Sequence, residues 1–215
     1  MVKKKKVVKK IMNENKISNK PVYKFLGFIL FLVLLFFVSS YLIKMTYNFD
    51  YQELSFTKEK FGDLKVYHHY YYFKDGYGEL FQYNLYLRND PRENNVSVDG
   101  KIVYPSQKDF IYISIGDRVE ECPDSSLAIA QLSSFITDNQ MFLKTGLANE
   151  NKAEESNVPH VSCDKYPDDF VISLMKGDET SITKKNKCYE IEIANCDILK
   201  AVEKFEVQSL VDRKN

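Results

Sequence analysis

The stretch that decides the fold is FLGFILFLVLLFFVSSYLI, residues 25–43, which contains no charged side chain. Lys24 and Lys44 lie on either side of it. A helix needs about 20 apolar residues to cross the hydrocarbon core of a bilayer, and this run nearly reaches that length. We therefore expect one transmembrane helix over Phe25–Ile43, which holds the chain in the lipid bilayer and divides it into two unlike pieces.

The net charge of zero hides opposite charges on the two sides of this run. Residues 1–44 contain ten lysines and one glutamate, a net charge of +9. Residues 45–215 contain 20 basic and 29 acidic side chains, a net charge of −9. Because positively charged segments beside a transmembrane helix stay in the cytoplasm, we expect a basic cytoplasmic arm over residues 1–24 and a C-terminal domain outside the cell membrane.

The basic arm has two interpretations. It can be a topology signal that also rests on anionic lipid headgroups, at about 1 kcal/mol per basic residue near the surface. It can also bind nucleic acid. The arm is short and lies directly against the membrane, so we favour the first interpretation and expect no nucleic-acid partner.

The apolar run can be a cleaved signal peptide or a permanent anchor. Val38-Ser39-Ser40 offers small residues for a signal peptidase. However, the apolar core of a signal peptide is usually about 7–15 residues long, which is shorter than this run. We therefore expect an uncleaved signal-anchor and a single-pass protein.

The exported piece is long enough for one domain with its own core. We expect residues 44–64 to form a membrane-proximal stalk and residues 65–215 to form an α+β domain with a mostly antiparallel sheet and about two helices. Alternating apolar residues and turn residues indicate the strands, and an apolar stripe marks each helix. The expected strands are Lys65–Phe73, Glu79–Arg88, Val96–Tyr104, Asp109–Ile115, Gln140–Lys144, Phe170–Met175, Thr180–Thr183 and Cys188–Ile193; the helices follow Pro123 and Asp197, and residues 148–157 form a loop.

All four cysteines lie in the exported piece: Cys122, Cys163, Cys188 and Cys196. An even number of cysteines outside the cell favours disulfides, although free thiols and a metal site with His160 remain alternatives. Three pairings are possible. If Cys188–Ile193 is an extended strand, Cys188 and Cys196 lie about 20 Å apart, too far for a bridge. This weakly favours Cys163–Cys188 together with Cys122–Cys196.

Seven of the 15 tyrosines fall between Tyr67 and Tyr86, in a predicted hairpin. On a strand, Tyr67, His69 and Tyr71 face one way, while Tyr70 and Tyr72 face the other. One face packs on the core, and the other can display aromatic side chains for recognition of a protein or a glycan. The alternative is that the tyrosines only pack in cross-strand pairs. The candidate binding residues are Tyr67, His69, Tyr70, Tyr71, Tyr72 and Tyr86.

The sequence contains no nucleophile motif, phosphate-binding loop or dinucleotide fingerprint. His68 and His69 are adjacent, so a strand points them apart and they cannot share a metal ion. We therefore assign no catalytic residue, cofactor or metal. Asn95-Val96-Ser97 is a sequon in a polar turn, and Asn95 is a possible glycosylation site.

Three stretches carry a resemblance: residues 83–102, 121–136 and 187–205. They resemble uncharacterised single-pass membrane proteins of archaeal genomes. The resemblance implies an exported, disulfide-bearing domain and an archaeal source, and it brings no activity, ligand or site residue with it.

Three functions agree with these observations. The first is a membrane-anchored extracytoplasmic binding or envelope-associated module. The second is an accessory subunit of a larger membrane complex, in which the small residues Gly27, Ser39 and Ser40 pack against other helices. The third is an exported enzyme of unknown class, although no residue pattern indicates a catalytic site.

Overall fold

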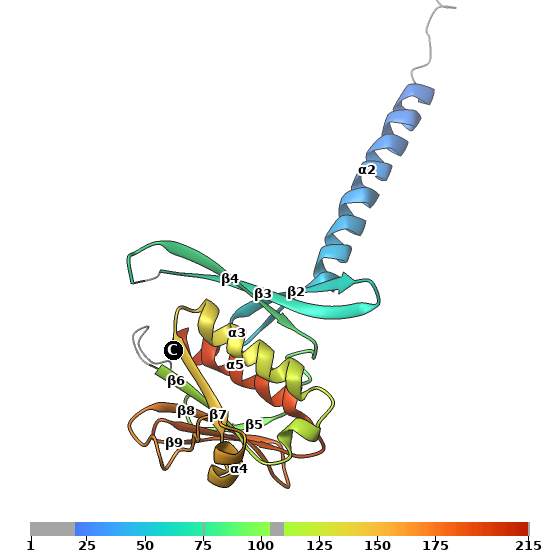
Figure 1. The fold of residues 1–215 in the computed structure, drawn as a ribbon. Helices are drawn as coiled ribbons and strands as arrows, with labels where there is room; N and C mark the ends of the chain where they lie inside the picture. Colours follow the sequence, from blue (N-terminus) through green and yellow to red (C-terminus); the bar gives the residue numbers. More distant parts are fainter. Residues whose placement is uncertain (1–19, 75, 104–109, 215) are drawn as a thin grey trace, which may run out of the picture. The chain divides into compact units, whose positions relative to one another are not determined.

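The computed structural model describes residues 20–74, 76–103 and 110–214 (Figure 1). The chain divides into two compact units, Met1–Tyr47 and Asn48–Asn215. Most of the expected basic arm, residues 1–19, lies outside the described residues, as do Asp75 and residues 104–109.

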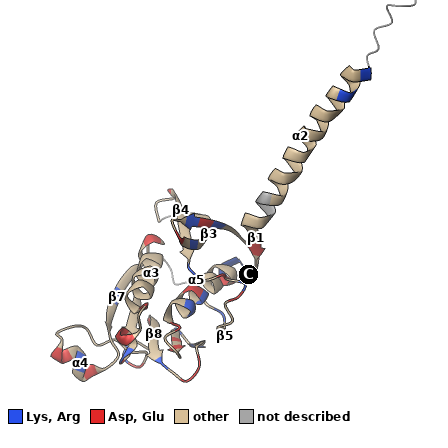
Figure 2. Ribbon diagram, turned by 90° about the vertical axis from the view of Figure 1, so that its right-hand side faces the viewer, with Lys and Arg blue, Asp and Glu red and all other residues tan. Residues whose placement is uncertain are grey.

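The described part of the first unit, residues 20–47, forms the helix α2 (Lys20–Tyr47). Its 23-residue span Lys20–Leu42 is long and apolar enough to cross a membrane, and none of it is buried within the protein. Figure 2 shows basic residues near the start of this helix, followed by a long uncharged part. A helix suits a bilayer because all its backbone groups hydrogen-bond within the segment, where no water is available. The predicted apolar helix is thus confirmed.

The second unit is an α+β domain, as predicted, and it contains two sheets. The first sheet has four antiparallel strands in the order β1-β2-β3-β4. Its strands are β1 (Asn48–Tyr51), β2 (Leu54–Phe61), β3 (Leu64–Lys74) and β4 (Leu80–Leu87). The expectation of a stalk over residues 44–64 is wrong for most of that segment, because β1 and β2 belong to this sheet.

The local sequence does not predict the hairpin of β1 and β2, and its turn residues explain why. Gln52 and Glu53 join β1 to β2, and both have positive φ angles, 47° and 65°. Two-residue hairpin turns of this kind usually carry asparagine, aspartate or glycine. In the next hairpin Gly62, with φ of 65°, supplies such a residue between β2 and β3.

The second sheet has six strands in the order β5-β9-β10-β8-β6-β7. Four of its strand pairs are parallel and only β9 with β10 is antiparallel, a feature that the sequence patterns did not indicate. Its strands are β5 (Ser97–Asp99), β6 (Phe110–Ile115), β7 (Phe142–Leu147), β8 (Phe170–Lys176), β9 (Ser181–Lys185) and β10 (Cys188–Ile193).

Two long helices, α3 (Ser125–Asp138) and α5 (Ile198–Lys214), lie between the two sheets (Figure 1). Leu132 and Val202 belong to the core that these helices share with the six-stranded sheet. Phe135 and Leu210 belong to the core that they share with the four-stranded sheet. The domain is therefore a three-layer structure with the helices in the middle.

The described residues also contain two short helices. A single 3-10 turn, η1 (Val119–Glu121), precedes α3. The helix α4 (Glu150–Glu155) replaces the loop that we expected over residues 148–157. Asn149 caps it, because its side chain accepts a hydrogen bond from the Lys152 N–H.

The four cysteines form the favoured pairs. Cys122 and Cys196 are bonded with their Cα atoms 5.2 Å apart, and each lies shortly before one of the long helices. Cys163 and Cys188 are bonded with their Cα atoms 5.7 Å apart. The second disulfide attaches the segment of residues 156–169, here called the strap, to β10.

The strap covers part of the face of the six-stranded sheet that points away from the helices. The ring of Tyr166 stacks on Tyr112 with centroids 4.3 Å apart. Val161 is buried and packs with Tyr112 and Val171, and the hydroxyl of Ser114 donates a hydrogen bond to the Val161 carbonyl. This face of the sheet is therefore closed in the region of β6 and β8.

Replacing Cys122 and Cys196 with serine tests the contribution of the first disulfide. The bond closes a loop with a sequence separation of 74, so its loss is expected to lower the free energy of unfolding by about 4 kcal/mol. Urea denaturation of the full chain in detergent, followed by circular dichroism, measures the change. The control C163S/C188S, with a separation of 25, is expected to lose less stability, about 3 kcal/mol, and to expose the strap to protease. An unchanged urea midpoint for C122S/C196S would contradict the expected role of this bond.

Candidate functional site

The four-stranded sheet has one face against the helices and one face that points away from them. We call the second the outer face. The strand register places alternate residues of β1 to β4 on it: Asn48, Asp50, Ser55, Thr57, Glu59, Phe61, Leu64, Val66, His68, Tyr70, Tyr72, Lys74, Leu80, Gln82, Asn84 and Tyr86.

Three of the six predicted binding residues lie on the inner face instead. His69 is buried, and its Nδ1 lies 2.8 Å from the Ser55 carbonyl oxygen. Tyr67 and Tyr71 pack against the inner core, and the Tyr71 hydroxyl donates a hydrogen bond of 2.6 Å to the Asn139 side chain. These three residues are therefore not part of an exposed binding surface. Successive residues of a strand point to opposite faces, and these three point to the core.

Burial explains the ionisation behaviour of these inner residues. Removal from water disfavours a charged form, so it lowers the pKa of His69 and raises the pKa of Tyr71. Both side chains are therefore neutral parts of the core at physiological pH.

The other three predicted residues lie on the outer face. Tyr70, Tyr72 and Tyr86 have exposed fractions of 55%, 57% and 43%. The ring of His68 stacks on Tyr86 with centroids 4.5 Å apart, and Tyr70 and Tyr72 meet edge to face at 6.0 Å. The rings are thus held by their neighbours while remaining accessible from outside.

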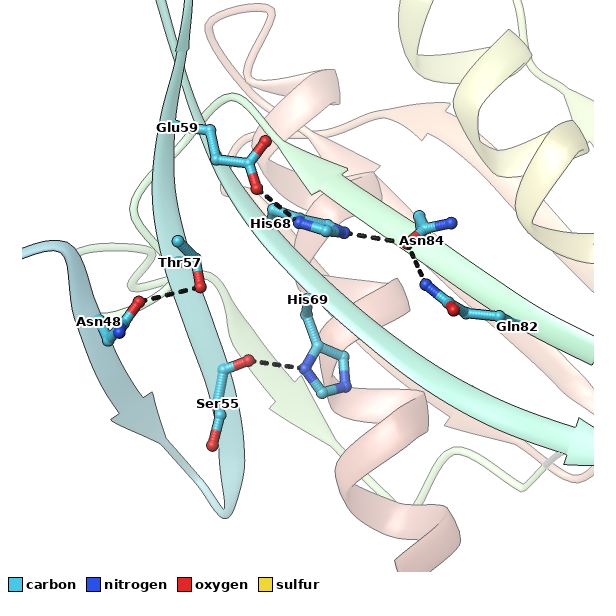
Figure 3. Close-up of polar contacts among 8 residues, drawn as sticks. All are labelled: Asn48, Ser55, Thr57, Glu59, His68, His69, Gln82 and Asn84. Atoms are coloured by element: carbon cyan, nitrogen blue, oxygen red, sulfur yellow. Dashed lines mark hydrogen bonds and ion pairs between the residues drawn. The ribbon is translucent and has the colours of Figure 1, made fainter. Parts of the chain in front are cut away.

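A row of polar contacts crosses the outer face from β2 to β4 (Figure 3). His68 Nδ1 lies 2.7 Å from the Glu59 carboxylate, and His68 Nε2 lies 3.1 Å from the Asn84 side-chain oxygen. The Gln82 amide also donates to that oxygen at 2.9 Å. These residues meet because of the register between neighbouring strands. The pattern of each single strand does not specify that register, so the sequence did not indicate this group of residues.

A shorter set of contacts ties β1 to β2 on the same face. The Thr57 hydroxyl donates to the Asn48 side-chain oxygen at 3.0 Å, as Figure 3 shows. The Ser55 hydroxyl donates to the Asp50 carboxylate at 2.6 Å. The outer face therefore combines accessible aromatic rings with fixed amide, hydroxyl and carboxylate groups.

Among the described residues, one group of side chains has the spacing of a metal site: Cys163, Cys188 and Glu190. Both cysteines are joined in a disulfide, so they offer no thiolate to a metal ion. His68 and His69 lie on opposite faces, as expected, and do not form a shared site. Asn95 is exposed before β5, where a glycosylating enzyme can reach it.

Two buried glutamates tie α5 to its neighbours, Glu203 to the segment after β4 and Glu206 to α3, and no sequence pattern indicated them. Glu203 accepts hydrogen bonds from the backbone N–H of Arg88 and from both the backbone and the side-chain amide of Asn89, the latter at 2.8 Å. Glu206 accepts a hydrogen bond of 2.7 Å from Gln131 on α3. Burial raises the pKa of Glu203 to about 7 and that of Glu206 to about 8.

Comparison of the chain with models of protein families, with curated proteins and with solved structures found no match. The resemblance to archaeal single-pass membrane proteins stays a prediction.

Glu206→Gln tests the effect of the buried carboxyl on stability. The folded protein keeps the Glu206 proton up to a pH of about 8, whereas the unfolded chain loses it near its ordinary pKa of 4.5. The folded state therefore binds more protons between these values, and its stability falls as the pH rises through this window. The variant is expected to be more stable than the wild type by roughly 4 kcal/mol at pH 8 and equally stable near pH 4.

Urea denaturation at several pH values measures this difference. Glu203 is unchanged in the variant and serves as an internal control, since its own pH dependence remains. A stability difference that is the same at pH 4 and pH 8 would show that Glu206 is ionised in the folded protein.

Proposed function

We propose that this protein is a membrane-anchored binding module whose outer face holds an envelope glycan outside the cell. The observation that carries this proposal is the combination of exposed rings and fixed polar groups on one sheet face. Flat aromatic rings offer apolar surface to the faces of sugar rings. The amide and carboxylate groups of Asn84, Gln82 and Glu59 offer hydrogen bonds to hydroxyl groups.

The location of the domain is part of the proposal. Two disulfides agree with an oxidising compartment outside the cytoplasm. The excess of lysine before the apolar helix agrees with a cytoplasmic N-terminus. The proposed topology therefore places the whole Asn48–Asn215 unit on the outer side of the membrane.

An accessory subunit of a membrane complex is the second candidate. It would need small residues along one face of α2 for packing against other helices, and the helix geometry does not provide such a face. Ser39 and Ser40 follow Gly27 by 12 and 13 residues. At about 3.6 residues per turn, these positions lie on faces of α2 that differ from that of Gly27. The glycan-binding module is therefore the better supported proposal.

The double variant Y70A/Y72A tests the binding face. It is expected to lose at least about tenfold in affinity for envelope glycan, because each ring contributes on the order of 1 kcal/mol of contact. Binding of the full chain in nanodiscs to a glycan array and to purified envelope polysaccharide measures the loss.

The matched control for this test is Phe142→Ala, which removes an exposed aromatic ring from β7 in the other sheet. The control is expected to bind as the wild type does. Capture of a protein instead of a glycan, or equal binding by wild type and Y70A/Y72A, would overturn the proposed ligand class.

Translation of the full chain into microsomes tests the orientation. If the second unit is translocated, Asn95 is expected to be glycosylated and the protein to show a mobility shift that endoglycosidase removes. The Asn95→Gln variant should show no shift. An unmodified protein whose C-terminal unit is open to external protease would mean that this unit faces the cytoplasm.

A further inference from the structure

The edge of the four-stranded sheet at β4 is open. Of the two outermost strands of this sheet, β1 and β4, the strand β4 is the longer, with eight residues against four. Among the residues that the structure describes, none forms a hydrogen bond with the N–H and C=O groups of β4 that point away from β3. An edge of this kind is a template for pairing with a further strand.

The other three edges of the two described sheets are protected by means that proteins commonly use. The strand β1 is short and carries Asp50, and β5 has three residues, one of which is Asp99. The strand β7 carries Lys144, and the strap covers its end, where the Leu147 N–H donates a hydrogen bond to the Pro159 carbonyl at 3.0 Å. These three edges are therefore poor templates for a further strand.

The strand β4 lacks these protections. Its sequence, LFQYNLYL, contains no charged residue and no proline. All eight residues pair with β3 in an unbroken register, so no bulge turns the edge away. Leu80 and Tyr86 are exposed and add apolar surface to this strand. Because the strand is uncharged, it can pair with a copy of itself without placing like charges opposite each other.

From these observations we infer that β4 pairs in antiparallel fashion with β4 of a second copy of this chain, which joins the two four-stranded sheets into one continuous sheet. Such a pair adds up to roughly eight backbone hydrogen bonds. The membrane anchor proposed for α2 holds the copies in one layer and so raises their effective concentration. The pairing does not depend on the proposed glycan binding.

The sequence of β4 favours one register, centred on Tyr83. Two antiparallel copies are related by a two-fold axis perpendicular to the sheet, so residues of the same face lie opposite each other and the two outer faces form one surface. Leu80 then lies opposite Tyr86 of the second copy, which brings apolar groups together. Gln82 lies opposite Asn84 of the second copy, and the two side-chain amides can hydrogen-bond. A centre at either neighbouring residue would place Leu80 opposite a polar side chain.

Cysteine cross-linking in native membranes tests this register. Two differently tagged forms of the full chain, Gln82→Cys and Asn84→Cys, are expressed together. All four native cysteines are paired, so each form carries one free thiol. Opposite residues of antiparallel strands have Cα atoms about 4.5–5.5 Å apart, which is within reach of a disulfide. We expect mild oxidation to join the two forms severalfold more than it joins either form to itself.

The matched control is Ser55→Cys expressed together with Thr57→Cys. These positions have the same spacing and lie on the same face, but they belong to β2, an interior strand. They are expected to give only the cross-linking that random collisions produce.

A second test adds charge to the edge. In Q82K/N84K the lysines of two copies would lie directly opposite each other, so pairing is expected to weaken severalfold or more. Co-purification of two differently tagged full chains from mildly solubilised native membranes measures the pairing, and circular dichroism checks that the variant is folded. The control S55K/T57K adds the same charge to β2 and is expected to co-purify as the wild type does.

Three results would overturn the inference. One is a failure of the two tagged wild-type chains to co-purify. Another is equal cross-linking by the two cysteine pairs, which would indicate random contact between copies. The third is cross-linking of Gln82→Cys only to a different protein, which would assign this edge to an extended segment of that partner.

Discussion

The burial of α5 between two sheets is the constraint on which the rest of the domain depends. A helix in this position has to be apolar nearly all round, and ten of its residues are buried. Glu203, Glu206 and Ser209 are the buried polar exceptions. Glu203 accepts hydrogen bonds from the segment after β4, and Glu206 accepts one from Gln131 on the neighbouring helix. The helix thus fixes the inner faces of both sheets and sets which residues of each strand point outward.

The outer faces of the two sheets then differ. The strap, held by the bond between Cys163 and Cys188, covers the six-stranded sheet where Tyr112 meets Tyr166. On the four-stranded sheet, Tyr70 and Tyr72 remain exposed. Large accessible aromatic groups are a recognised sign of an interaction surface. The six-stranded sheet also exposes Phe110 and Phe142, so the polar groups fixed beside the tyrosines, rather than exposed rings alone, support the proposed binding role of the four-stranded sheet.

The sequence predicted those features that depend on neighbouring residues. The apolar run predicted α2, and the period of two separated Tyr70 and Tyr72 from Tyr67 and Tyr71, but the face that meets the core could not be identified without the helices. The hairpin at Gln52 and Glu53 lacks the usual turn residues. The parallel pairs of the second sheet and the contacts of Glu59, His68 and Asn84 depend on distant strands, whose register no local pattern specifies.

Photo-crosslinking from the outer face in native membranes tests the central claim most directly. A diazirine-bearing amino acid replaces Tyr72 in one variant and Phe142 in another, and adducts are identified by mass spectrometry. The account predicts saccharide adducts at Tyr72, which competing envelope glycan removes, and none at Phe142. Adducts at neither position, or equal adducts at both, would contradict the claim that the outer face of the four-stranded sheet is the binding surface.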